Sequence, residues 1–154
     1  IDALGPFDTD PCANDPRPWD CARHNIALPQ NGLSLQWSGF VWMNPPFHRY
    51  EVRHWLQKMA EHGHGIALLH ARTETEWFEV CWRHASAMLF MQTRLMFHQP
   101  SGELCVITKP GPNYGKSANS GAPPVLVAFG GEARDRLEKS GIPGALVMGW
   151  NYRV

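Results

Sequence analysis

The four residues Asn44-Pro45-Pro46-Phe47 combine two hydrogen-bond acceptors, a rigid backbone and an aromatic ring. An amine on an aromatic base is a poor nucleophile, because its lone pair is delocalised into the ring. Two acceptors aimed at its N–H bonds would return that lone pair to nitrogen. The side-chain oxygen of Asn44 and the backbone carbonyl of Pro45 can supply them, and Phe47 can stack on the base. The segment therefore predicts a pocket that activates an amine.

A base inside a nucleic-acid duplex can enter such a pocket only if it is flipped out of the helix. Stacking on Phe47 would offset part of the cost of unstacking the base. No strong general base is needed, since the amine becomes acidic once alkylated and can release its proton late. The competing interpretation is a plain turn, because Asn and Pro are common turn formers.

The sequence around this segment predicts how it is held. Residues 39–43 form a short β-branched and aromatic run, and the two prolines that follow prevent both further strand pairing and an immediate helix. Apolar residues at helical spacing predict a helix over residues 50–62. The segment should therefore lie in a loop at the carboxyl end of a strand, where open α/β sheets bind ligands.

Short apolar runs alternate with helix-period segments along the chain, which predicts an α/β fold. Further strands are expected over residues 66–70, 88–91, 125–129 and 145–148, and helices after a capping box at 73–76 and over 132–139. We expect one compact domain over residues 1–154, with a Rossmann-like, mainly parallel sheet and helices on both faces. A long stretch rich in Gly, Pro, Ser and Asn makes residues 98–124 the expected loop insertion for target recognition.

The balance of charge limits the surface that could bind nucleic acid. Fourteen basic and fourteen acidic side chains give zero formal net charge, which argues against a surface that grips phosphates everywhere. Contacts should therefore be local. The candidate patches are Arg49, Arg53 and Lys58 after the tetrapeptide, and Lys109 with Lys116 in the later segment.

Other functional classes find little support in the sequence. The eight histidines and four cysteines show no grouping typical of metal ligands, so no metal site is predicted. Cysteines without close pairing fit a reducing cytoplasm. The apolar runs are much shorter than the ~20 residues of a membrane-spanning helix.

Six ordered segments together resemble the compact, Dam-like DNA N6-adenine methyltransferases of phages and prophages. They are residues 7–13, 31–33 with Trp37, 41–47, 71–75 with 77–78, 94–97 and 123–129. The resemblance implies transfer of a methyl group from S-adenosylmethionine to the N6 amine of adenine in DNA. It also implies that Asn44, Pro45, Pro46 and Phe47 are the catalytic residues, within a methyltransferase of the bacterial cytoplasm.

The resemblance further implies a cofactor site in the first segment. Asp10-Pro11-Cys12-Ala13, at the end of the first strand, should lie against S-adenosylmethionine, with Asp8 just upstream. A carboxylate there can accept hydrogen bonds from the cofactor ammonium group or attract its positive charge. The acidic residue for the cofactor ribose is not evident from the pattern, and Asp20 is the candidate.

The expected partner is DNA, with no membrane and no obligatory protein partner. Arg72 and Thr73 follow the strand next to the catalytic one, so both should border the cleft, where Arg72 could hold a phosphate. Arg49, Lys109 and Lys116 complete the expected substrate contacts.

The chain also departs from the family pattern. His70 stands where the family tends to have proline, and Phe47 where tyrosine is more frequent. Other readings therefore stay open at this stage: a methyltransferase acting on an RNA base or a protein glutamine nitrogen, or a nucleic-acid-binding module that has lost catalysis.

Overall fold

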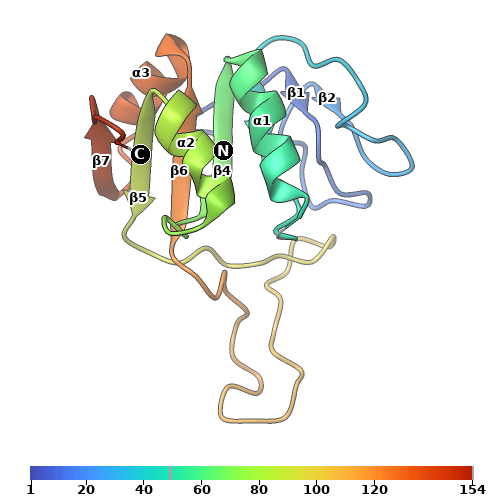
Figure 1. Cartoon of the computed structure of the whole chain (residues 1–154). Helices are drawn as coiled ribbons and strands as arrows, with labels where there is room; N and C mark the ends of the chain where they lie inside the picture. The colour runs from blue at the N-terminus through green and yellow to red at the C-terminus, as the bar shows by residue number, and fades with distance from the viewer. Residues whose placement is uncertain (49, 154) are drawn as a thin grey trace.

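The computed structural model describes residues 1–48 and 50–153, in which seven strands form one mixed sheet (Figure 1). The order across the sheet is β2-β1-β3-β4-β6-β5-β7. The strands are β1 (Thr9–Asp10), β2 (His24–Asn25), β3 (Val41–Met43), β4 (Gly65–His70), β5 (Ala87–Met91), β6 (Pro124–Phe129) and β7 (Gly144–Met148). The helices are α1 (Val52–His62), α2 (Glu79–His84) and α3 (Gly131–Lys139), with a 3-10 turn, η1 (Glu76–Phe78), before α2. The α/β class is confirmed.

The expectation of a mainly parallel sheet is wrong. β2, β1, β3 and β4 pair in parallel, but β6 pairs antiparallel with both β4 and β5, and β7 pairs antiparallel with β5. The cause is the connection after β5. Residues 92–123 leave and return at the same edge of the sheet, so β6 must run in the opposite direction from β5 (Figure 1).

Helices cover both faces of the sheet, as expected. Alternate residues of β4 and β6 point to opposite sides, so that Ala67 and Val127 join one core and Ile66 and Ala128 the other. The first core contains the apolar faces of α1 and α2, and the second contains Ala133 and Leu137 of α3. The central strands β3, β4 and β6 are therefore buried on both faces, whereas the outer strands β2 and β7 are more exposed.

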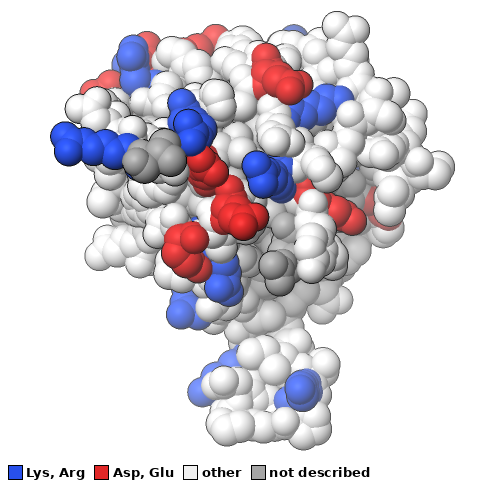
Figure 2. Space-filling model, in the orientation of Figure 1, with Lys and Arg blue, Asp and Glu red and all other residues white. Residues whose placement is uncertain are grey.

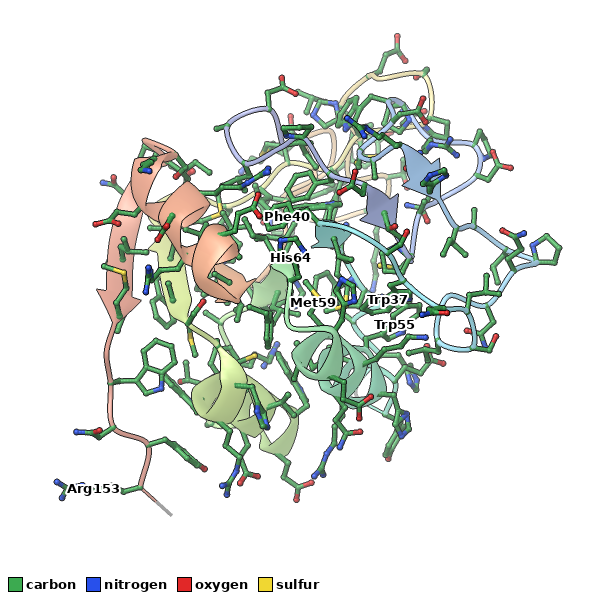
Figure 3. The ribbon with its side chains drawn as sticks, turned by 90° about the horizontal axis from the view of Figure 1, so that it is seen from above. Trp37, Phe40, Trp55, Met59, His64 and Arg153 are labelled. Carbon is green, nitrogen blue, oxygen red and sulfur yellow. The ribbon has the colours of Figure 1, made fainter. Side chains whose placement is uncertain are left out.

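The loop before β3 is anchored by α1. The Lys58 ammonium donates to the carbonyls of Gly32, Leu33 and Leu35, and it lies 5.0 Å from the centre of the Trp37 ring. Trp37 stacks on Trp55 of α1 with ring centres 6.1 Å apart, as Figure 3 shows. Lys58 is thus a structural cation rather than part of a free basic patch.

This anchored loop supports the turn after β1. A side chain at position 32 would collide with the backbone carbonyl of Pro11, so only glycine fits between the two segments. At the other end of the same strand, the Asp8 carboxylate accepts the Phe40 N–H at 2.8 Å. Gly39, with φ of +66°, leaves room for that carboxylate. Contacts at both ends therefore set β1 beside β3.

Most expected elements appear within one or two residues, but the capping box does not. Thr75 precedes η1 without a side-chain cap, and its hydroxyl donates to the carbonyl of Arg72 at 2.7 Å. The segment starts as a 3-10 turn because Thr75 closes a turn back onto Arg72. No helix within residues 1–48 and 50–153 is long and apolar enough to cross a bilayer.

Replacement of Lys58 by methionine should destabilise the fold. Methionine keeps the apolar stem but leaves three carbonyls without their shared donor, which should cost about 1–3 kcal/mol. Chemical unfolding of K58M and of a control on the exposed side of α1, Gln57→Met, measures the difference. Equal stability of the two variants would show that the carbonyls of the loop do not depend on Lys58.

Candidate active site

The two sequence-predicted loops emerge side by side at the carboxyl edge of the sheet. The chain passes from β1 outward to β2 and then returns to β3 on the other side of β1, with Thr9 paired to Val41. This reversal is the position at which open α/β sheets bind ligands. The backbone of Asn44 lies close enough to the Cys12 thiol to oppose the rise in its pKa, so the end of β3 lies beside the end of β1.

A cleft of about 360 Å³ opens at this edge, a size within the usual range for small-molecule pockets. Both predicted loops line it, through Asp10, Cys12 and Ala13 on one side and Asn44 and Phe47 on the other. Further walls come from the ends of β4 and β5, from the start of β6, and from the segments that follow β5 and precede β6. The lining also includes Arg17, Trp19, Trp42, Leu68, His70, Met96, Phe97, His98, Ser120, Leu126 and Ile142.

Asp10 is the buried acid of the cleft, with 5% of its surface exposed. Burial raises its pKa from 3.8 to about 6, although hydrogen bonds from Cys12 oppose the change. One of these bonds runs from the Cys12 N–H to Asp10 Oδ1 at 3.1 Å. A cationic ligand beside this carboxylate would restore its charged form.

Cys12 and Cys21 also line the cleft, and both are thiols rather than thiolates. Burial is the main cause that raises the pKa of Cys12 well above its ordinary value, and the nearby Asp10 adds to it. Burial and Asp10 also raise the pKa of Cys21, to about 11. Neither cysteine is activated as a nucleophile.

Asn44 is exposed and Pro45 is buried. The asparagine therefore faces outward, next to a proline that is packed into the protein. Phe47 is 40% exposed at the mouth of the cleft. Its ring stacks on His70, the last residue of β4, with ring centres 4.0 Å apart and an angle of 13° between the planes. Burial and the charge of Arg72 lower the pKa of His70, which favours the neutral imidazole.

Several predicted residues lie outside the lining of the cleft. The carboxylate of Asp8 accepts a hydrogen bond from the Phe40 N–H and forms an ion pair of 3.5 Å with Arg23. Pro11 is buried against Gly32. Asp20, the ribose candidate, forms an ion pair of 2.6 Å with Arg17 in an exposed loop.

The predicted substrate contacts are spread along the same edge of the sheet. Arg72 and Thr73 are exposed directly after β4. Lys109 and Lys116 are exposed in the excursion of residues 92–123, which protrudes from the body and carries basic side chains on the face seen in Figure 2. Arg49 lies outside the described residues. The structure therefore brings Asp10, Cys12, Ala13, Asn44 and Phe47 into one cleft, and leaves these described cations outside its lining.

Sequence reasoning missed one side of the cleft, formed by Arg17 and Trp19. Trp19 is 47% exposed, and its ring meets His98 of the excursion edge-on at 5.2 Å. Phe97, which is 46% exposed, lies on the same rim. The only signal in the sequence was an aromatic residue and an arginine in a polar, proline-rich stretch after Asp10.

A sequence model of the family described as DNA N-6-adenine-methyltransferase (Dam) matches residues 2–127. The matched region holds both loops of the cleft and nearly the whole sheet. The chain belongs to the Dam family. The same comparisons gave no match among curated proteins and none among solved structures.

Membership of the Dam family makes this chain a DNA N6-adenine methyltransferase, with DNA as its substrate and S-adenosylmethionine as the implied methyl donor. The cleft fits such a cofactor, because it offers a buried carboxylate to a positively charged ligand among largely apolar walls. No group of three or more His, Cys, Asp or Glu residues within the described ranges could hold a metal ion.

Asp10→Asn should alter the pH dependence of stability. Since the pKa of Asp10 is raised from 3.8 to about 6, the folded chain holds this proton more tightly than the unfolded chain. The native chain should therefore lose about 2–3 kcal/mol of stability relative to D10N as the pH rises from about 4 to about 7. Denaturant unfolding at several pH values measures this difference.

Asp2→Asn, an exposed acid at the start of the chain, is the control and should show no such trend. Titration with S-adenosylmethionine at pH 8 should show binding by D10N weakened by about ten-fold or more. A stability difference that is the same at every pH would contradict the buried, protonatable carboxylate.

Proposed function

We propose that adenine flipped from DNA enters the cleft beside Asn44 and Phe47, while S-adenosylmethionine lies along Asp10-Pro11-Cys12-Ala13. The observation that carries this proposal is that the two loops line one cleft, at the point where the strand order reverses. A methyl donor and an acceptor amine must approach within bonding reach. Adjacent loops at one sheet edge provide that arrangement.

In this proposal the amine of adenine donates to Asn44 Oδ1 and to the carbonyl of Pro45. Both acceptors are set before substrate arrives, since Pro45 is buried and two prolines restrict the turn. S-adenosylmethionine would supply the methyl group on its sulfonium, and Asn44 and Pro45 would hold the nitrogen with its lone pair toward that group. The transfer would form one N–C bond and break one C–S bond, and the nitrogen would then release one proton to solvent.

Burial of Asp10 supports its role toward the cofactor. The desolvated carboxylate gains most from a ligand that brings its own positive charge. Pro11 and Ala13 would add shape rather than charge, since Pro11 fixes the turn over Gly32 and Ala13 lines the wall. Asp8 would act indirectly, by holding β1 against the start of β3.

DNA would approach the same edge, where Arg72 and Thr73 stand after β4 and the excursion protrudes. The two legs of the excursion run antiparallel, with bridges between Met96 and Asn119 and between Val106 and Ser117. Such a two-stranded ribbon can enter a DNA groove. We propose residues 98–124 as the target-recognition insertion of a single catalytic domain that works in the bacterial cytoplasm, with Arg49 as a further phosphate contact.

The two alternatives left open by the sequence, another methylated substrate and a binding module without catalysis, are less well supported. Substrates such as RNA bases or protein glutamine need the same two acceptors, but the family match over residues 2–127 specifies DNA adenine. A binding module without catalysis would have no use for the shared cleft of Asp10 and Asn44.

Asn44→Ala should abolish most of the methyl transfer and leave cofactor binding intact. Loss of a preorganised acceptor at the reacting nitrogen should lower kcat by about 10²–10³-fold. Transfer of labelled methyl from S-adenosylmethionine to unmethylated DNA, followed by digestion to nucleosides, identifies the product as 6-methyladenine.

Asn151→Ala makes the same chemical change at an exposed site in the C-terminal tail, and should keep full activity. Undiminished 6-methyladenine from N44A would exclude Asn44 as the acceptor. Label in another base or in no product would refute the proposed substrate.

The double variant Lys109→Ala with Lys116→Ala should weaken DNA binding in a salt-dependent way. If each lysine contacts one phosphate, the slope of log K against log salt should fall by about 2. Titration of DNA at several salt concentrations gives this slope.

The control is Arg134→Ala with Arg153→Ala, which removes the same charge at exposed sites, one of them labelled at the far end of the tail in Figure 3. It should leave the slope unchanged. An equal loss in both double variants would mean that net charge alone, and not the excursion, sets the affinity.

A further inference from the structure

In the stack of Phe47 on His70, one ring is more deeply buried than the other. Phe47 is 40% exposed at the mouth of the cleft. His70 is less exposed, and its Nε2 atom is buried without a hydrogen-bond partner among the described residues. His70 is therefore the inner ring of the pair and Phe47 the outer ring, with the imidazole covering one face of Phe47 and the phenyl ring still partly exposed.

The inner ring is held more firmly than the outer one. His70 ends β4, where it pairs with Pro124 in the adjacent strand, and the next residue, Ala71, donates its N–H to the carbonyl of Pro123. Phe47 lies in a loop, outside the strands whose backbone hydrogen bonds hold the sheet together. The ring that the sheet fixes thus supports the ring that the loop carries.

We infer that His70 is a positioning residue, whose ring supports Phe47 from within so that the outer face of Phe47 is ready to stack on the flipped adenine. This inference rests on the proposed function. The bound state would be a stack of three rings, in the order imidazole, phenyl, adenine. Without His70 the phenyl ring would lose its support and could rotate away from the plane that the base requires.

The chemistry of the imidazole agrees with support rather than proton transfer. Burial and the neighbouring Arg72 lower the pKa of His70 and favour its neutral form. A neutral ring stacks without placing a charge beside the cationic methyl donor. The Nε2 atom is buried and has no hydrogen-bond partner among the described residues through which a proton could be passed on.

The opposite arrangement would have His70 occupy the place of the base and leave when adenine enters. The buried edge of its ring argues against this, because a ring that must leave should be the more exposed of the two. The two arrangements predict opposite signs for loss of the ring. If His70 supports Phe47, truncation of His70 should weaken stacking of the base. If His70 occupies the place of the base, the same truncation should strengthen it.

The experiment compares the native chain with His70→Ala, His70→Leu and His70→Phe, using a duplex with 2-aminopurine at the methylated position. Fluorescence of that base reports its removal from the DNA stack, and methyl transfer to ordinary DNA gives kcat and KM. S-adenosylmethionine binding and thermal unfolding verify that each variant is folded.

We expect H70A and H70L to lower kcat/KM for DNA by about three- to ten-fold, from the usual strength of an aromatic pair, with cofactor affinity unchanged. H70F, which restores a flat ring, should recover most of this loss. In the Phe47→Leu background, H70A should have almost no further effect, since the support acts through Phe47.

Three outcomes would overturn the inference while leaving the proposed function intact. They are unchanged kcat/KM in H70A, a gain in H70A, and a loss in H70F as great as that in H70A, which would indicate that the imidazole nitrogens and not a flat ring are needed. Full additivity of H70A with F47L would overturn it as well. Absence of 6-methyladenine from the native chain would overturn the proposed function, and the inference with it.

Discussion

The parallel pairing of β1 with β3 is the constraint on which the cleft depends. β1 contains two residues, so little ladder holds it, and the register is secured from outside. The Thr9 hydroxyl donates to the Ser38 carbonyl at 2.8 Å, and the Asp8 carboxylate accepts the Phe40 N–H. A one-residue slip would turn Asp10 away from its present face and separate it from Asn44. Short strands at this site are therefore compensated by side-chain hydrogen bonds to the backbone.

Zero net charge does not mean a uniform surface, because several cations are used inside the structure. Lys58 is surrounded by loop carbonyls. The Arg136 guanidinium donates to the carbonyls of Leu4 and Pro6 and lies 4.0 Å from the centre of the Phe40 ring. Such cations hold segments in place and are poorly placed to neutralise phosphates. The cations available to DNA are the exposed ones, which explains how a neutral chain can still bind a polyanion locally.

The excursion between β5 and β6 has two consequences for the molecule. It returns the chain to the sheet in the opposite direction, which places β6 between β4 and β5. It also brings His98 against Trp19, so that the rim beyond Asp10 and the excursion meet above the cleft. A single connection thus joins the architecture of the sheet to the surface proposed to recognise DNA.

The sequence by itself determined the class of fold and most of its elements. Prolines 45 and 46 end a strand for local steric reasons, and the helix of Trp55 and Met59 follows from local periodicity. These features depend on neighbours along the chain, so they can be read without the fold. The family resemblance rested on the same local segments.

Only the tertiary structure decided the direction of the strands, which side chains are buried and which residues they contact. The sequence did not show that β6 and β7 run antiparallel, because apolar runs carry no sign of direction. It also did not show that Asp8 holds β3 while Asp10 enters the cleft, or that Lys58 serves loop carbonyls. The stacking of His70 on Phe47 and the raised pKa of Asp10 likewise depend on residues far apart in the chain. Desolvation and contact arise only when distant segments pack together, and that is the physical reason why local patterns cannot specify them.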